Sequence, residues 1–171
     1  PRIPAGAPEL GVSLGASGGI EVDGFMQTDI PGVYAVGDVT GQHMYAYVAA
    51  KEAEIAIDHL TGGSKSMDYS FIPSVVFTNP EVASVGKRMS EMDPSVTRKG
   101  SFPVSALGRA RTMDVSDGFA HVYCTPAGKI ERITIMAPHA TELISWATLA
   151  VSLGLGLEEF PPSLGIRPNI P

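Results

Sequence analysis

The chain has 171 residues, 44% of them hydrophobic, and its 12 Lys and Arg residues against 18 Asp and Glu residues give a net charge of -6. This length suits one domain or one and a half. The acidic balance argues against nucleic-acid binding, which rests on clustered basic residues. No apolar run reaches membrane-spanning length and no signal-peptide pattern opens the chain. We therefore expect a cytoplasmic protein without nucleic-acid or membrane partners.

The first 65 residues contain two short strand candidates and one helix. The strand candidates are residues 19–23, "GIEVD", and residues 33–36, "VYAV", the second of which suits a strand buried on both faces. The helix is expected in "MYAYVAAKEAEIAIDHL", which is rich in Ala and is followed by a Gly-Gly stop signal. Its predicted buried stripe comprises Val48, Ala49, Ala53, Ala56, Ile57 and Leu60.

Residues 62–69, "GGSKSMDY", are expected to form a linker, and we expect domains at 1–65 and 66–171. Beyond the linker, strands are predicted at 74–78, 81–86, 100–110, 117–124 and 129–136, with one short helix within 87–95. The turn at 125–129 should join the last two strands as a hairpin. A helix is then expected in residues 138–154, with Leu143, Ile144, Ala147, Ala150, Val151 and Leu153 on one broad face. Strands followed by a helix indicate an α+β layer sandwich with an antiparallel sheet.

Few residues outside one motif indicate chemistry. Cys124 is the only cysteine, which excludes an internal disulfide, and its alternating strand context favours a buried apolar role. The four His residues show no metal-ligand spacing, so no metal site is expected. Trp146 lies in the long helix, where core packing and subunit pairing remain equally open.

The informative motif is a strand, then Gly37-Asp38, then a helix. Glycine lets the backbone approach a ligand closely. A carboxylate at the carboxyl end of a strand lies where α/β sheets place their ligands. The helix that follows presents free N–H groups and the positive end of its dipole. These features suit a nucleotide or a flavin, although an ordinary turn-forming Asp explains the pair equally well.

The longer segment around this motif, "GIEVDGFMQTDIPGVYAVGDVTG", resembles the second flavin-binding signature of the pyridine nucleotide–disulfide oxidoreductases. Further stretches, "VVFTNPEVASVG", "FPVSALGRARTMDVSDGFAHVYC" and "PHATELISWATLAVSLGLGLEEF", are similar to the family's interface domain, in the same order. The resemblance implies the last strand–helix segment of an FAD-binding α/β domain, followed by an antiparallel interface domain that pairs two subunits. It also implies FAD and NAD(P)H as cofactors of the full-length protein, most closely in the manner of dihydrolipoamide dehydrogenases.

The resemblance assigns site residues one by one. It implies that Asp38, next to Gly37, accepts a hydrogen bond from the ribityl chain of FAD. It implies that the start of the following helix meets the pyrimidine end of the flavin, through Met44, Tyr45 and Ala46, with Tyr47 close by. The family's Gly-rich FAD fingerprint, its paired redox cysteines and its NAD(P)H domain are not present in these residues. Both ends look truncated, so we expect a piece of a larger protein that is inactive alone.

The closing "FPPSLGIRPNIP" departs from the family pattern. It is similar to a His-Pro-Thr tail whose His serves as the general acid/base for a dithiol, but Arg167 occupies the His position. Arginine stays protonated in proteins and cannot act as that base. No catalytic residue is therefore assigned. Two alternatives to disulfide chemistry stay open: a flavoprotein that reduces quinones or metal ions, and a non-catalytic dimerisation module.

Overall fold

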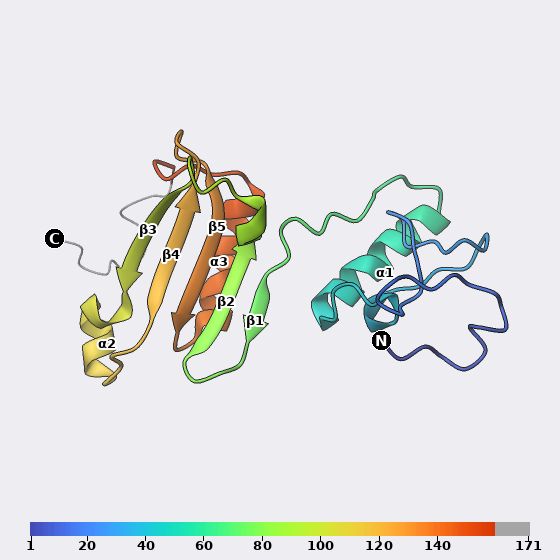
Figure 1. Cartoon of the computed structure of the whole chain (residues 1–171), viewed down its shortest axis with the longest axis horizontal. Helices are drawn as coiled ribbons and strands as arrows, with labels where there is room; N and C mark the ends of the chain where they lie inside the picture. Colours follow the sequence, from blue (N-terminus) through green and yellow to red (C-terminus); the bar gives the residue numbers. More distant parts are fainter. Residues whose placement is uncertain (160–171) are drawn as a thin grey trace. The chain divides into compact units, whose positions relative to one another are not determined.

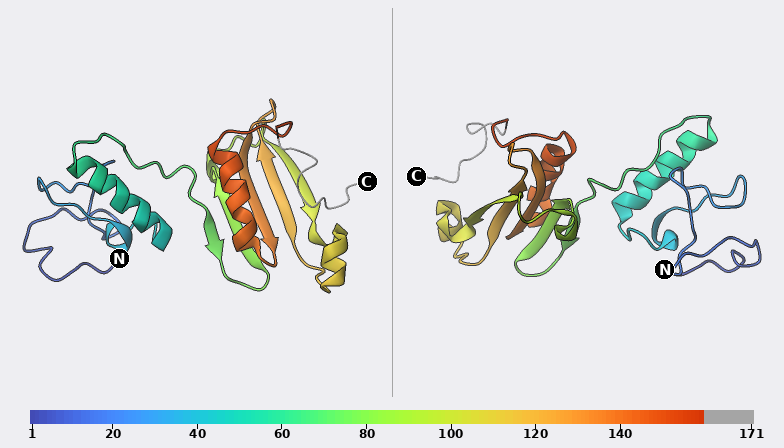
Figure 2. Two further views of the ribbon diagram at one scale, coloured as in Figure 1. Left: turned by 180° about the vertical axis from the view of Figure 1, so that it is seen from behind. Right: turned by 45° about the horizontal axis from the view of Figure 1, so that its top comes forward.

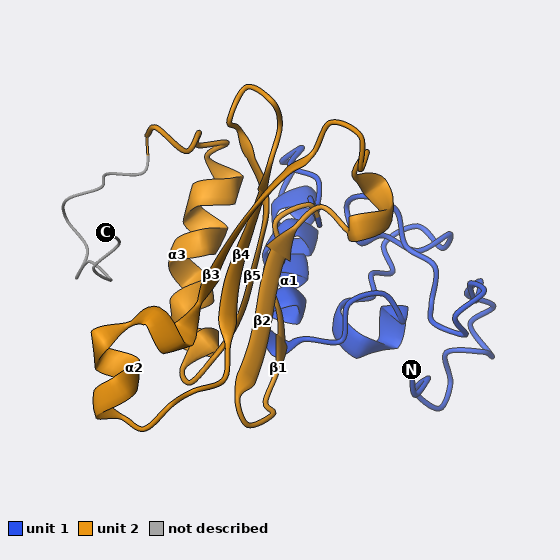
Figure 3. Ribbon diagram, turned by 60° about the vertical axis from the view of Figure 1, so that its left-hand side comes forward, with its two compact units in different colours: residues 1–69 blue, residues 70–171 orange. Residues whose placement is uncertain are grey.

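The computed structural model describes residues 1–159, and the chain forms two compact units. The first unit comprises residues 1–69 and the second begins at Ser70 (Figure 3). Each is described by itself. No helix among residues 1–159 is long and apolar enough to cross a membrane.

The first unit is mostly irregular chain around one long helix. The 3-10 helix η1 (Gly37–Thr40) precedes the helix α1 (Ala46–Leu60). The Gly-Gly stop is confirmed, because α1 ends at Leu60 and Gly62 has a φ of 89°. Met67 and Tyr69, from the stretch expected as a linker, pack against a buried cluster of Met26 and residues of α1.

The predicted buried stripe of α1 is partly wrong. Val48 and Ala56 are buried, but Ile57 and Leu60 are 60% and 54% exposed. The buried residues are instead Val48, Glu52, Ile55 and Ala56, which still follow three- and four-residue spacing. The apolar pattern missed this face because one of its members is a carboxylate.

The two short strands expected in the first unit do not form ladders. Residues 19–23 and 33–36 form only the isolated bridges Leu14↔Ile20 and Gln27↔Tyr34, with separate backbone hydrogen bonds to other segments, such as that from the Ile20 N–H to the Val39 carbonyl. Of residues 33–36, only Ala35 is buried, which contradicts a strand covered on both faces. An apolar run becomes a strand only where one neighbouring segment supplies a continuous set of backbone partners. The backbone partners of these two runs are instead scattered over several segments of residues 1–69.

The second unit contains a five-stranded antiparallel sheet, which confirms the expected α+β class (Figure 1). Its strands are β1 (Ser74–Val76), β2 (Glu81–Gly86), β3 (Arg98–Pro103), β4 (Phe119–Cys124) and β5 (Ile130–Ala137), in the order β1-β2-β5-β4-β3. The predicted hairpin joins β4 to β5, where the Thr125 N–H donates to the Lys129 carbonyl at 2.9 Å. Cys124 is buried, as expected.

The expected strand at 100–110 ends early. β3 stops at Pro103, and the chain continues as the 3-10 helix η3 (Val104–Ala106) and the short helix α2 (Gly108–Thr112). Val104 and Ala110 are buried against Ala137 of β5, and Leu107 packs against the same cluster, so this segment buries apolar groups every third residue, as helical turns do, and not at alternating positions. The short helix expected within 87–95 is the 3-10 helix η2 (Met89–Glu91).

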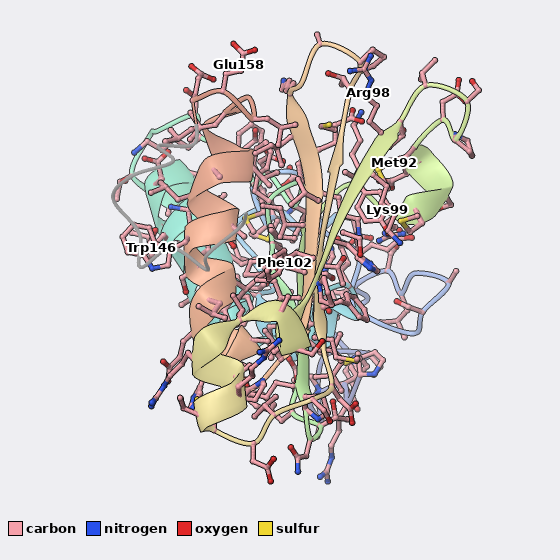
Figure 4. All side chains as sticks on the ribbon, turned by 90° about the vertical axis from the view of Figure 1, so that its left-hand side faces the viewer. Met92, Arg98, Lys99, Phe102, Trp146 and Glu158 are labelled. Carbon is pink, nitrogen blue, oxygen red and sulfur yellow. The ribbon has the colours of Figure 1, made fainter. Side chains whose placement is uncertain are left out.

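The helix α3 (Ala140–Ser152) lies against one face of the sheet (Figures 1 and 2). The core between them contains Ala83, Val85, Ile130, Ile133, Ala140, Ile144, Ala147 and Val151. Leu143 and Leu153 were expected on this face, but they are 48% and 64% exposed. Trp146 is 75% exposed and points away from the sheet, so it is not part of this core (Figure 4). The helix α3 has apolar side chains around more of its circumference than the sheet can cover, so some of them stay exposed.

A carboxylate from β2 holds the start of α3. Glu81 Oε2 accepts hydrogen bonds from the Thr141 backbone N–H at 3.0 Å and from its hydroxyl at 2.7 Å. The residue before the helix, His139, has a φ of 61° and makes no side-chain cap. The Thr141 bonds, first from the backbone and then from the side chain, hold the pKa of Glu81 below its usual 4.5, and His139 adds a smaller effect.

We expect the Glu81→Gln substitution to lower the thermal stability of the protein at neutral pH. The contribution of Glu81 is present above its ordinary pKa of 4.5 and disappears as the pH falls through its lower native-state pKa. Thermal unfolding midpoints of wild type and variant should therefore converge in acid. Glu142→Gln, in the first turn of α3 and with an 81% exposed side chain, is the control. A gap between wild type and Glu81→Gln that stays constant down to acidic pH would contradict this assignment.

Candidate functional site

The Gly-Asp turn lies at the end of an extended segment that closes with Val36. Gly37 is buried with a φ of 77°, a conformation that side chains with a Cβ rarely adopt. A Cβ built at this position would lie 3.0 Å from the Cβ of Ala49 on α1. The structure thus supplies two reasons for glycine here, backbone conformation and contact with α1.

The backbone of η1 is held from two sides. The Thr40 hydroxyl donates to the Gly37 carbonyl at 2.9 Å, and the Ile20 N–H donates to the Val39 carbonyl at 2.9 Å. The side chain of Asp38, between these anchored residues, is exposed. The turn therefore presents a carboxylate to the outside on a fixed backbone.

The start of α1 is formed by Tyr45 and the residues that follow it. Tyr45 precedes the helix in an extended conformation, no side chain of residues 1–159 caps it, and its first turn holds no acidic residue. Met44 and Tyr47 are 58% and 47% exposed, and the rings of Tyr45 and Tyr47 stack at 5.2 Å. Partial burial, and secondarily Tyr45, raise the pKa of Tyr47. The positive end of the helix dipole is therefore available to an electron-rich group.

The six residues selected from the sequence, Gly37, Asp38, Met44, Tyr45, Ala46 and Tyr47, all lie on η1 or at the start of α1 in the first unit. Contact between Gly37 and Ala49 brings these two elements together. Arg167 lies outside the described residues. Among residues 1–159, no group of three or more His, Cys, Asp or Glu side chains could hold a metal ion.

Sequence reasoning missed two residues behind this site. Glu52 has no exposed surface, and its Oε2 accepts the Gly37 N–H at 2.5 Å. Its Oε1 accepts the Tyr69 hydroxyl at 2.8 Å. Burial first, and then the bond to Glu52, raise the pKa of Tyr69. The signal for Glu52 was its position four residues after Val48, in phase with the buried face of the helix.

Comparison with known families covers most of the chain. The model of the pyridine nucleotide-disulphide oxidoreductase dimerisation domain matches residues 72–171. The model of the pyridine nucleotide-disulphide oxidoreductases matches residues 3–53. The chain therefore belongs to the pyridine nucleotide-disulphide oxidoreductase family, and residues 3–53 are a short tail of its FAD domain.

Curated relatives narrow the likeness to dihydrolipoyl dehydrogenases. The enzyme of Chlamydia trachomatis is 39% identical over 96% of this chain and 36% of that protein. The mitochondrial enzyme of Homo sapiens is 36% identical over 96% of this chain and 33% of that protein. The chain thus spans about a third of the length of the curated relatives that it matches.

Solved structures agree with this assignment. LpdA from Mycobacterium tuberculosis superposes with a TM-score of 0.85 at 29% identity, over 97% of this chain and 38% of that one. A Cu(II) complex of the flavoprotein disulfide reductase RclA from Escherichia coli superposes with a TM-score of 0.80 at 26% identity, over 91% of this chain and 37% of that one. The chain thus corresponds to the C-terminal, dimerisation portion of flavoprotein disulfide oxidoreductases akin to dihydrolipoyl dehydrogenase, a family that depends on FAD and NAD(P).

The environment of Gly37 gives a stability prediction with an internal control. Gly37→Ala should lower the free energy of unfolding by about 2–3 kcal/mol, because positive φ costs a residue with a Cβ about 1–2 kcal/mol and the new methyl group would lie only 3.0 Å from the Cβ of Ala49. Gly32→Ala should cost only the conformational part, since Gly32 has a φ of 79° with nothing within 4 Å of a Cβ. Denaturant unfolding of both variants measures the difference. Equal losses would show that contact with Ala49 contributes nothing.

Proposed function

We propose that this chain supplies the FAD-contacting and dimerisation parts of an NAD(P)H-dependent flavoprotein disulfide oxidoreductase that acts in the manner of dihydrolipoamide dehydrogenase. The observation that carries the proposal is the exposed Asp38 carboxylate on an anchored turn, beside an uncapped helix start. Asp38 falls inside the segment matched by the family model, residues 3–53. The chain alone should be inactive.

The residues present fit a flavin by their chemistry. The Asp38 carboxylate can accept a hydrogen bond from a hydroxyl of the ribityl chain. The start of α1, at Met44, Tyr45, Ala46 and Tyr47, can face the pyrimidine end, where a helix N-terminus favours negative charge by up to about 1–2 kcal/mol. When bound, FAD would carry electrons from NAD(P)H to the acceptor. The residues of this chain would bind and orient it.

The second unit supports pairing of two subunits. Leu143, Trp146, Leu149 and Leu153 are exposed on α3 at three- and four-residue spacing. Leu143 and Trp146 also line an apolar cavity of about 440 Å³, together with residues of α2, β4 and β5. Apolar surface of this extent typically marks an interaction site, and the matching family model describes a dimerisation domain. We infer a homodimer, with the FAD-domain segment at 1–65 and the interface domain at 66–171, in the cytoplasm.

Arg167 favours a second candidate function. In the family tail, its position belongs to the His that shuttles a proton, and a guanidinium cannot exchange protons near neutral pH. This difference favours an acceptor that needs no such base, such as a quinone or a metal ion. A non-catalytic dimerisation module remains the alternative in which the flavin contacts serve no reaction. Turnover assays of the full-length protein with lipoamide, glutathione disulfide, a quinone and Hg(II) separate these candidates.

The Asp38→Ala substitution should weaken FAD retention in the full-length protein. A hydrogen bond to a charged group contributes about 1.5–3 kcal/mol, so the dissociation constant should rise about 10–100-fold. Flavin remaining after dialysis measures the loss. Asp38→Asn, which keeps one acceptor oxygen, should fall between wild type and Asp38→Ala. Unchanged flavin content in Asp38→Ala would remove Asp38 from the site.

Arg167→His in the full-length protein tests the proton-shuttle interpretation. A His at this position has a pKa near neutrality and can exchange a proton with a dithiol. General acid–base catalysis typically contributes about 10²–10⁴-fold, so lipoamide turnover should rise by at least about tenfold while quinone turnover stays constant. Arg167→Lys is the matched control, since it keeps the positive charge. If lipoamide turnover does not rise, the presence of Arg167 at the family's His position is not what limits proton transfer to a dithiol.

A further inference from the structure

Glu52 connects the middle of α1 to the turn that carries Asp38. Its side chain has no exposed surface, and its Oε2 lies 2.5 Å from the Gly37 nitrogen. Gly37 immediately precedes Asp38, so this bond constrains the Val36–Gly37 peptide group, next to the residue that carries the proposed ribityl contact. A charge that makes hydrogen bonds inside a protein is held far more rigidly than one on the surface, because losing a partner costs a large desolvation penalty.

Tyr69 holds the other oxygen of Glu52. Its hydroxyl donates to Oε1 at 2.8 Å and also lies 3.7 Å from the Met26 sulfur. Its ring stacks on the His43 ring, with 4.8 Å between the centroids and an interplanar angle of 20°. Tyr69 thus contacts both the buried carboxylate and the loop that leads into α1.

His43 continues the chain of contacts to the helix start. Its backbone carbonyl accepts the Tyr45 N–H at 3.0 Å, and Tyr45 is the residue that precedes α1. The series Gly37, Glu52, Tyr69, His43 and Tyr45 therefore joins the Asp38 turn to the start of α1. These are the two elements assigned to opposite ends of the flavin contact.

We propose that Glu52 and Tyr69 are positioning residues that fix the distance between the Asp38 turn and the start of α1, so that both can contact one FAD molecule. Neither side chain touches the flavin in this proposal. Glu52 acts through the Gly37 N–H and Tyr69 acts through Glu52 and His43. This inference rests on the proposed FAD site.

The chemistry of the two oxygens explains the choice of a carboxylate. Both partners of Glu52 are donors, an N–H and an O–H, and an ionised carboxylate offers two acceptors. A glutamine has the same shape but only one acceptor oxygen, so it cannot accept both the Gly37 N–H and the Tyr69 O–H, and the Tyr69 hydroxyl would have to turn to accept from the NH₂ group. Glu52→Gln therefore removes one of the two acceptor contacts with little change in volume. Tyr69→Phe removes the Tyr69 bond and keeps the ring on His43.

The test uses the full-length protein with FAD bound. We measure the FAD dissociation rate from the rise of free-flavin fluorescence, the absorption spectrum of the bound flavin, and the thermal unfolding midpoint of the apoprotein. Glu52→Gln should raise the dissociation rate about tenfold and shift the spectrum. Tyr69→Phe should raise the rate about threefold to tenfold. Glu54→Gln, on the exposed side of the same helix with a side chain 69% exposed, should change neither.

A double variant tests whether Glu52 acts through the turn. If it does, the fold increase in the FAD dissociation rate of the double variant Glu52→Gln/Asp38→Ala should be much smaller than the product of the fold increases of the two single variants. A full product would show that Glu52 affects FAD by a route independent of Asp38, and it would overturn the proposal.

Failure of this inference is distinguishable from failure of the proposed function. If Asp38→Ala releases FAD faster while Glu52→Gln and Tyr69→Phe keep wild-type rates and spectra, the positioning role is wrong and the FAD site stands. If Glu52→Gln lowers only the apoprotein midpoint, the bond serves folding alone and the proposal also fails. If Asp38→Ala has no effect on FAD, the site itself is wrong. Should Glu52→Gln not fold, the milder Tyr69→Phe decides.

Discussion

A carboxylate with no exposed surface must find its hydrogen bonds inside the protein, and for Glu52 these partners are the Gly37 backbone and the Tyr69 hydroxyl. The first unit has no sheet of its own among residues 1–69, so its irregular chain is held mainly by such contacts and by two small apolar clusters. Glu52 lies at the point where α1, the Gly-Asp turn and the last residue of the unit meet. Its bond to Gly37 links that turn to the helix, and its bond to Tyr69 links the helix to the end of the unit.

The second unit is organised by a different constraint. Its antiparallel sheet satisfies the backbone through regular ladders, and α3 covers the part formed by β2 and β5. One 13-residue helix cannot cover five strands, so apolar surface remains on β4, α2 and the outer side of α3. The unit has more apolar surface than it can bury, which accounts for the exposed Trp146 and suits a segment that matches the model of a dimerisation domain.

The two units therefore correspond to two roles that the family combines. Residues 3–53 match the model of the flavin-dependent oxidoreductases, and residues 72–171 match the model of their dimerisation domain. The likeness to dihydrolipoyl dehydrogenases extends over nearly the whole chain, but over about a third of those proteins. The chemistry proposed here belongs to the full-length protein, to which this chain would contribute an anchored carboxylate, a helix start and a pairing surface.

The sequence by itself determined the family, the α+β class, the β4–β5 hairpin and both long helices. The family follows from motif sequences, and the other features follow from local periodicity and turn residues. It could not determine which side of α1 is buried, since Glu52 breaks an apolar pattern and is buried only because Gly37 and Tyr69, 15 and 17 residues away, supply its donors. Nor could it show that residues 19–23 and 33–36 form isolated β-bridges and not strands, or that the chain after Pro103 is helical. Those outcomes depend on which partners the fold brings alongside, and only the tertiary structure decides that.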